Sequence, residues 1–305
     1  MAGNMVKVRR HRIKQSFSDY ITDCAIYAIL MFGLVIVLYP LVYVTSASFS
    51  STQAVMSGAV KLWPVEFSLY AYEVVFRNQK IVTGYLNSFI YTILGTGITL
   101  LLTILYAFCL SRKDFFGRGV INFLVVFTMF FSGGLIPTYL LVRNLGMLNS
   151  IWAMVLPNAM NAWFVILTRT YFQSNIPEEL YESANLDGCS VFRMLVSITL
   201  PLSGPIIAVI SLYCAVGIWN GYFDAFLYLT KSNLQPLQTV LRDILLLTKM
   251  DSTMVGDVRD LAMRQGLSNL LKYAVIVVSS VPLLMLYPFV QKYFVKGIMI
   301  GSLKG

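Results

Sequence analysis

The chain has 305 residues, of which 57% are hydrophobic and 12% are charged, and its formal net charge is +9. Soluble domains carry about 25% charged residues, so this composition argues against a soluble protein and predicts a membrane protein with several crossings. The basic residues flank apolar blocks, so we expect them to set membrane orientation rather than to bind nucleic acid. One histidine and four cysteines suggest no metal cluster, histidine-based triad or disulfide framework.

Six apolar blocks are each long enough to cross a bilayer, which takes about 20 residues in a helix. Because no water hydrogen-bonds the backbone inside lipid, each crossing should be helical. The predicted transmembrane helices are about 23–47, 85–110, 119–140, 151–173, 203–228 and 271–295. The first block is too long for the core of a signal peptide, so we interpret it as an uncleaved helix after the basic tail 1–22. The predicted fold class is an all-α membrane protein with six transmembrane helices.

Lysine and arginine residues set the orientation of these six helices. They gather in the tail 1–22, in the short loop 111–118 and in the C-terminal tail 296–305, which all lie on one side of the membrane. Since short basic segments face the cytoplasm, both termini are predicted to be cytoplasmic. The other segments are then the external 48–84 and 229–270 and the internal loop 174–201.

Ionisable residues are scarce inside the predicted helices, and Asp224 is the one carboxylate well within a block. Proton- and sodium-driven carriers depend on charged relays inside the membrane, so this scarcity argues against a stand-alone secondary carrier. No Gly-Lys dipeptide occurs, which excludes a phosphate-binding loop of the GxxxxGK[ST] type. No acid–base pair supports a membrane enzyme. If ATP drives this protein, another chain must bind it.

The internal loop 174–201 is acidic, unlike the other internal segments. Pro177 suits the first turn of a helix, two glutamates follow it where they complement the helix dipole, and Gly188 suits the left-handed residue that ends the helix. A second short helix is predicted between Gly188 and Leu200. The alternative is an amphipathic helix resting on the membrane surface, but such helices are normally basic.

The same loop resembles the EAA loop of bacterial ABC importer permeases, in which E-A-A is followed by three residues, G, nine residues, I, one residue and L-P. The chain matches every spacing and departs only in Ser183, which replaces the first alanine. The resemblance implies that the loop docks as a coupling helix into a cleft on a separate ATPase, with Glu182 and Gly188 foremost. The alternative of a membrane scaffold is disfavoured, because a scaffold would not need the full spacing of this motif. The residues implicated in coupling are Glu182, Ser183, Ala184, Asp187, Gly188, Ile198, Leu200 and Pro201.

Further segments resemble the carbohydrate branch of this family, which has the type I ABC importer permease fold and is similar to the second, MalG-like permease of maltose-type transporters. The tail resembles the LplC/YtcP-like subgroup, found mainly in Gram-positive bacteria and linked to oligosaccharides from complex polysaccharides. A permease for an amino acid, phosphate or another solute is the alternative. The segments that carry this resemblance are Leu62-Trp63-Pro64, Tyr85-Leu86-Asn87-Ser88, 130–138, Trp219-Asn220 and 293–305.

The resemblance implies that residues 85–295 form the permease core and half of a pathway for a sugar or oligosaccharide across the bacterial plasma membrane. The implied partners are two ATPase subunits that hold ATP and Mg, a second homologous permease, an extracellular solute-binding protein and membrane lipid. It implies no cofactor and no enzyme activity in this chain itself.

A sugar pathway needs aromatic faces together with amide or hydroxyl groups in a concave pocket. Polar groups in lipid tend to face the interior of a helix bundle. The alternatives are interhelical hydrogen bonds and an interfacial aromatic belt, and in maltose-type relatives the partner permease makes most sugar contacts. Gly133-Gly134 and Pro137 also predict a break or tight packing in the third helix. The candidate pathway residues are Asn158, Asn161, Trp163, Tyr213, Trp219, Asn220, Tyr222 and Asp224.

Overall fold

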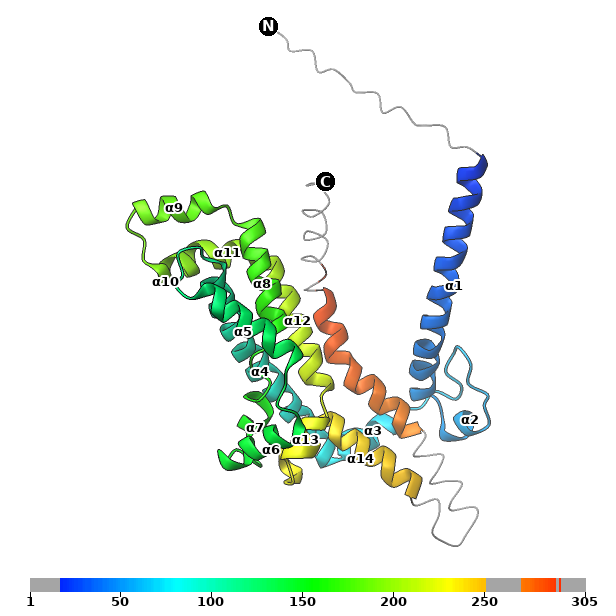
Figure 1. Cartoon of the computed structure of the whole chain (residues 1–305). Coiled ribbons are helices and arrows are strands. Elements are labelled where there is room, and N and C mark those ends of the chain that lie inside the picture. The colour runs from blue at the N-terminus through cyan, green and yellow to red at the C-terminus, as the bar shows by residue number, and fades with distance from the viewer. Residues whose placement is uncertain (1–16, 251–269, 289–290, 292–305) are drawn as a thin grey trace.

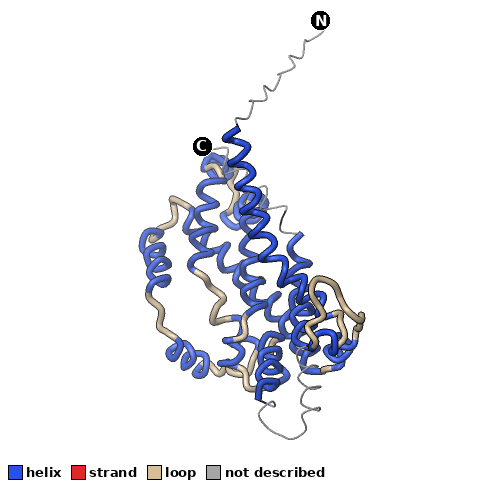
Figure 2. Tube along the Cα trace, turned by 90° about the vertical axis from the view of Figure 1, so that its right-hand side faces the viewer, coloured by secondary structure: helices blue, strands red, loops and turns tan. Residues whose placement is uncertain are grey.

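The computed structural model describes residues 17–250, 270–288 and 291, and within these residues every regular element is a helix (Figures 1 and 2). The helices of the first part of the chain are α1 (Phe17–Ser48), α2 (Thr52–Met56), α3 (Tyr70–Arg77), α4 (Gln79–Ser111), α5 (Arg118–Phe130), α6 (Leu135–Asn144), α7 (Ile151–Val155) and α8 (Ala162–Asn175). The helices that follow are α9 (Glu178–Leu186), α10 (Val191–Met194), the π-helix η1 (Leu195–Thr199), α11 (Leu200–Leu202), α12 (Gly204–Asn220), α13 (Phe223–Tyr228), the 3-10 helix η2 (Ser232–Leu234), α14 (Leu237–Met250) and Leu270–Pro288.

The long helix α4 is the central element of the bundle. It has 33 residues, which at 1.5 Å per residue gives a length of about 50 Å, and it contacts α8, α12 and α14. Small residues on its buried face let neighbouring helices approach closely. At Gly95, a Cβ atom would come within 2.7 Å of Ile218 Cδ1 on α12, and at Gly84 it would lie 3.2 Å from the Leu237 Cα. The close packing of α12 and α14 on α4 therefore depends on glycine at these two positions of α4.

Three predicted transmembrane helices are each divided into two helices in the structure. Between α5 and α6 the chain bends by 112°, and Gly134 in the break has φ +86°, a conformation that glycine adopts without strain. Pro157 lies between α7 and α8, where its missing N–H and its effect on the preceding residue interrupt the helix. Gly221 follows α12 with extended backbone. The divided segments are the predicted 119–140, 151–173 and 203–228.

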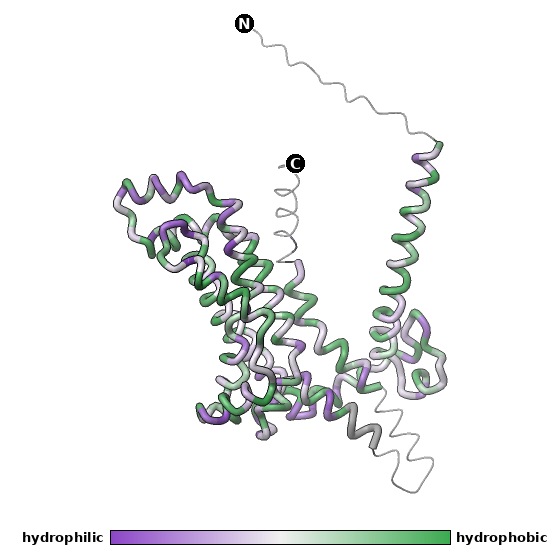
Figure 3. Tube along the Cα trace, in the orientation of Figure 1, coloured by the Kyte–Doolittle hydropathy of each residue, from purple (hydrophilic) through white to green (hydrophobic). Residues whose placement is uncertain are grey.

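Helix α1 stands apart from the rest of the bundle (Figure 1). Its most apolar stretch buries nothing against the chain, and Figure 3 shows that hydrophobic residues cover much of its length. Its end is packed, because Ala47 joins a small cluster and Tyr43 meets Tyr273 of the last helix edge-on at 5.8 Å. An apolar surface of this extent needs lipid or another protein chain around it.

Several predicted segments lie wholly or partly outside the described residues. Most of the basic tail 1–22 and all of the tail 296–305 fall there. The external segment 229–270 is described up to residue 250, and the predicted helix 271–295 is described to residue 288 and at residue 291.

Candidate functional site

The segment from α9 to α11, which we call the α9–α11 hairpin, projects from one end of the bundle (Figure 1). Its turn is built around Gly188, whose φ is +71°. The Cys189 amide donates to the Ala184 carbonyl at 2.9 Å, and the Gly188 amide donates to the Asn185 carbonyl at 3.0 Å. These two bonds form a Schellman motif, which satisfies the last carbonyls of a helix. The predicted left-handed glycine therefore ends α9.

Helix α9 has one face packed on the chain and one face open. Tyr181 and Ala184 are buried, in a cluster with Phe172 and Met194, whereas Glu182 is exposed. Ala184 is one of the residues that the resemblance to the EAA loop implicates in coupling. Its small side chain is instead covered by this chain itself, and the surface left for a partner is the opposite, largely hydrophilic face (Figure 3).

The second arm of the hairpin also has a packed side and an exposed side. Ser190 caps α10 by accepting a bond from the Arg193 amide. Ile198 and Leu200 pack against the buried cluster, while Pro201 is exposed. The remaining predicted coupling residues are exposed: Glu182, Ser183, Asp187 and Gly188.

Exposed apolar side chains stand on both sides of the Gly188 turn. Leu186 is 89% exposed and Phe192 is 73% exposed, and Val191 beside it is exposed as well. These residues are not among the predicted coupling residues. The signal was present in the chain, because these large apolar residues lie within four positions of the predicted turn glycine. Water-exposed apolar groups of this kind indicate a surface that another molecule covers.

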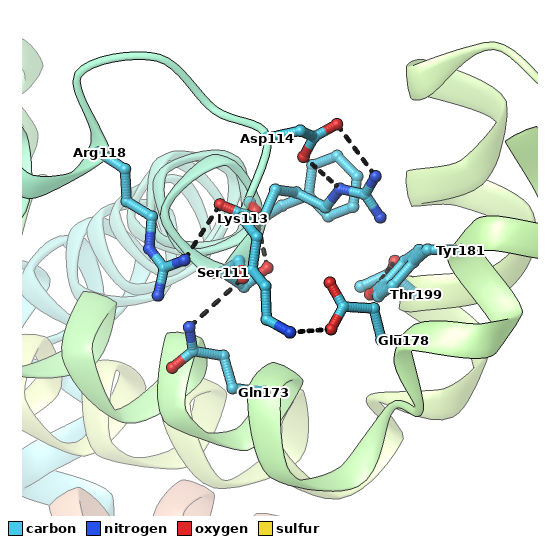
Figure 4. Close-up of polar contacts among 10 residues, drawn as sticks. Ser111, Lys113, Asp114, Arg118, Gln173, Glu178, Tyr181 and Thr199 are labelled. Carbon is cyan, nitrogen blue, oxygen red and sulfur yellow. Dashed lines mark hydrogen bonds and ion pairs between the residues drawn. The ribbon is translucent and has the colours of Figure 1, made fainter.

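The inner side of the hairpin is tied to the loop between α4 and α5 (Figure 4). The Arg112 guanidinium lies 4.5 Å from the centre of the Tyr181 ring, and Asp114 holds it through two bonds of 3.1 and 3.2 Å. The Tyr181 hydroxyl lies 3.1 Å from the Thr199 hydroxyl, with which it shares a hydrogen bond. Lys113 forms an ion pair with Glu178. The hairpin therefore has two anchoring points on one short loop, at Arg112 and Lys113.

These contacts surround a cavity of about 480 Å³ between the end of α4 and the start of α9. Burial raises the pKa of the Tyr181 phenol above 10.0, although the Thr199 hydrogen bond and the Arg112 charge oppose this shift. The hydrogen bond from Arg112 lowers the pKa of Asp114 below 3.8. Both groups consequently keep one protonation state throughout the physiological pH range, neutral for Tyr181 and ionised for Asp114.

A second cavity, of about 270 Å³, lies among α4, α7, α8 and α12. It brings together four of the eight predicted pathway residues, Asn158, Asn161, Tyr213 and Asp224. The Asn158 amide donates to the Asp224 carboxylate at 2.7 Å, and Asn161 also caps α8. Amide, phenol and carboxylate groups in one hollow form a surface that matches hydroxyl-rich ligands.

The other four predicted pathway residues are not among the residues that line this cavity. Trp219 is 2% exposed, its indole N–H donates to the Ser279 carbonyl at 2.9 Å, and it therefore serves the interhelical packing considered as the alternative. Tyr222 lies beneath the Arg242 guanidinium at 5.7 Å. Trp163 and Asn220 are exposed.

No family model matches the chain, but curated proteins and a solved structure do. The chain is 45% identical over 285 residues to the polygalacturonan/rhamnogalacturonan transport system permease protein YtcP of Bacillus subtilis, which covers 93% of this chain and 98% of that protein. It is 41% identical over 272 residues to the protein LplC of the same organism, covering 88% and 90%. A chain in the crystal structure of a bacterial ABC transporter involved in the import of the acidic polysaccharide alginate has a TM-score of 0.83 and 34% identity, over 92% of this chain and 99% of that one. These similarities confirm the resemblance that the loop spacing and the tail predicted.

Proposed function

The chain belongs to the permease subunits of ABC importers, and from this premise we propose that it forms half of a pathway that carries a sugar or oligosaccharide into the cell. It is a transport subunit and not an enzyme, because its relatives are permeases and ATP hydrolysis takes place in a partner chain. Membership of this family argues against the alternative of a stand-alone secondary carrier.

The permease is a multi-pass membrane protein, and we place it in the bacterial plasma membrane with six crossings and both termini in the cytoplasm. In the described residues three helices are long and apolar enough to cross, and up to five crossings result if each of two bent helix pairs is counted as one span. The sixth would be formed by α7 and α8 together. The start of α1 and the α9–α11 hairpin lie toward the same end of the molecule (Figure 1), which agrees with a cytoplasmic position for both.

The observation that carries the coupling role is the exposed surface around Gly188. It combines the carboxylates of Glu182 and Asp187 with the apolar side chains of Leu186 and Phe192, on two arms that pack in one buried cluster. A partner with a hydrophobic cleft and a basic rim would match this surface. We assign the cleft to one of two ATPase subunits that hold ATP and Mg, so that closure of the ATPases moves the hairpin. A second permease would form the other half of the pathway.

A double substitution tests this assignment. Glu182→Lys together with Gly188→Asp reverses the exposed charge and strains the turn, and we expect it to abolish uptake while the subunit remains in the membrane. Uptake is measured in cells with labelled substrate, and membrane content is measured by immunoblot. Glu73→Lys, a charge reversal on α3 away from the hairpin, is the matched control and should transport normally. Normal uptake by the double variant would refute the coupling assignment.

The substrate class rests on the relatives and on the cavity that contains Asn158 and Asp224. YtcP is named for polygalacturonan and rhamnogalacturonan, and the solved neighbour imports alginate. The cavity with Asn158 and Asp224 offers partners for sugar hydroxyls. An extracellular solute-binding protein would deliver the sugar. Thermal-shift screening of that binding protein against sugars, amino acids and phosphate separates this proposal from another solute class.

A further inference from the structure

The Tyr181 side chain occupies the junction of three segments. Its ring is 6% exposed, lies edge-on to Phe108 of α4 with centres 6.4 Å apart, and carries the Arg112 guanidinium over its face at 4.5 Å. Its hydroxyl bonds Thr199 of η1, a residue that is 0% exposed. One aromatic side chain of α9 therefore contacts the end of α4, the loop after α4 and the second arm of the hairpin (Figure 4).

The geometry of Arg112 is fixed from its far side. Asp114 accepts two bonds from the guanidinium, and a bidentate pair of this kind holds the planar group in one orientation. The Arg112 side chain is largely buried, with 16% exposed. A cation held over an aromatic ring and shielded from water interacts more strongly with it than an exposed cation does.

The other anchoring contact has a different character. The side chains of Lys113 and Glu178 are 73% and 45% exposed. Water and salt screen an exposed ion pair, which therefore contributes little. Of the two anchoring contacts to this loop, the Arg112–Tyr181 contact is consequently the one able to resist displacement of α9.

Arg112 directly follows Ser111, the last residue of α4. Helix α4 contacts α8 and α12, which line the cavity that contains Asn158 and Asp224. A displacement of α9 that presses on the Tyr181 ring would be passed to Phe108 in the last turn of α4 and to Arg112, the residue that follows this helix. The hydrogen bond to Thr199 makes the second arm of the hairpin follow the first.

We propose that Arg112, Tyr181 and Thr199 form a buried link that passes movement of the α9–α11 hairpin to α4, and that they are positioning residues for coupling. This inference rests on the proposed coupling function. It assigns transmission to a face of α9 opposite to the face that docks, and to residues outside the docking surface. The link is also independent of the exposed Lys113–Glu178 pair.

The test uses the complete importer in proteoliposomes, with both permeases, the ATPases and the binding protein. The readout is the amount of substrate transported per ATP hydrolysed, at equal amounts of assembled complex. Arg112→Gln and Tyr181→Leu should lower this ratio about tenfold, because each removes the shielded cation–aromatic contact. Arg112→Lys keeps the cation and should recover part of the loss. Lys113→Gln is the matched control on the same loop and should leave the ratio unchanged.

Assembly is checked by co-purification of the ATPase. If Tyr181→Leu or Arg112→Gln does not assemble, Tyr181→Phe and Thr199→Val decide the outcome, since each removes one hydroxyl and should lower the ratio about fivefold. An unchanged ratio in assembled Arg112→Gln, or in both hydroxyl variants, overturns the link. If the Glu182→Lys/Gly188→Asp variant still fails to transport in that case, the coupling surface stands and the link alone is wrong.

Discussion

Replacing Gly188 by alanine tests how the end of α9 is fixed. The residue has φ +71°, and a Cβ atom built on it would meet nothing within 4 Å. The substitution therefore causes no collision, and its cost is conformational, about 1–2 kcal/mol for an L-residue in the left-handed region. Since 1.36 kcal/mol corresponds to a factor of ten, the population of the frayed helix end should rise about 5- to 30-fold.

Hydrogen exchange reports this fraying directly. The amides of Gly188 and Cys189 are protected by their bonds to the carbonyls of Asn185 and Ala184, and they should exchange faster by the same factor when exchange proceeds through local opening. Mass spectrometry of peptides covering 178–190 in the assembled importer measures the rates. Peptides covering α3 should not change.

Asparagine at position 188 provides the comparison. It enters the left-handed region several-fold more often than most residues, so Gly188→Asn should accelerate exchange less than Gly188→Ala. If Gly188→Ala exchanges no faster than the unsubstituted protein, the turn does not depend on the positive φ. If Gly188→Ala and Gly188→Asn exchange at equal rates, the free-energy cost of the substitution is not conformational.

Two further predictions concern the helix bundle. Gly95→Leu forces a side chain against Ile218 and should destabilise the permease by about 1–3 kcal/mol, measured as a lower melting temperature in fluorescence-detected size exclusion. Gly97→Leu is the control and should be neutral, because a Cβ atom there meets nothing within 4 Å. Equal effects of the two variants would contradict the close approach of α4 and α12 at Gly95. Trp219→Phe should lower stability by about 1 kcal/mol through its lost hydrogen bond and leave the KM for uptake unchanged. Asn158→Ala should raise that KM several-fold. A raised KM in Trp219→Phe with an unchanged KM in Asn158→Ala would show that Trp219 is a pathway residue.

The features predicted correctly from sequence are local ones. The start of α9 after Pro177 and its end at Gly188 depend on backbone chemistry within a few residues, and both can be read from residue type and spacing. Long apolar blocks likewise indicate where apolar helices occur, because a bilayer crossing requires a minimum length. The breaks at Pro157 and Gly221 had local signals too, but hydropathy averages over such short interruptions.

Long-range contacts could not be predicted from one sequence. Arg112 and Tyr181 lie far apart in the chain, and nothing near either residue indicates that one covers the ring of the other. Trp219 has the residue type of a sugar-binding platform, and only packing decides that its indole faces a neighbouring helix. The same holds for Ala184, whose small size suits both an internal contact and an external one.

The isolation of α1 affects how this chain can vary. Its residues take part in one small cluster near Ala47 and in none of the other four buried clusters of the described residues. A substitution or insertion in the part of α1 before Tyr43 is therefore expected to require no compensating change in the bundle around α4. We therefore expect α1 to tolerate changes suited to different surroundings while the bundle around α4 keeps its packing.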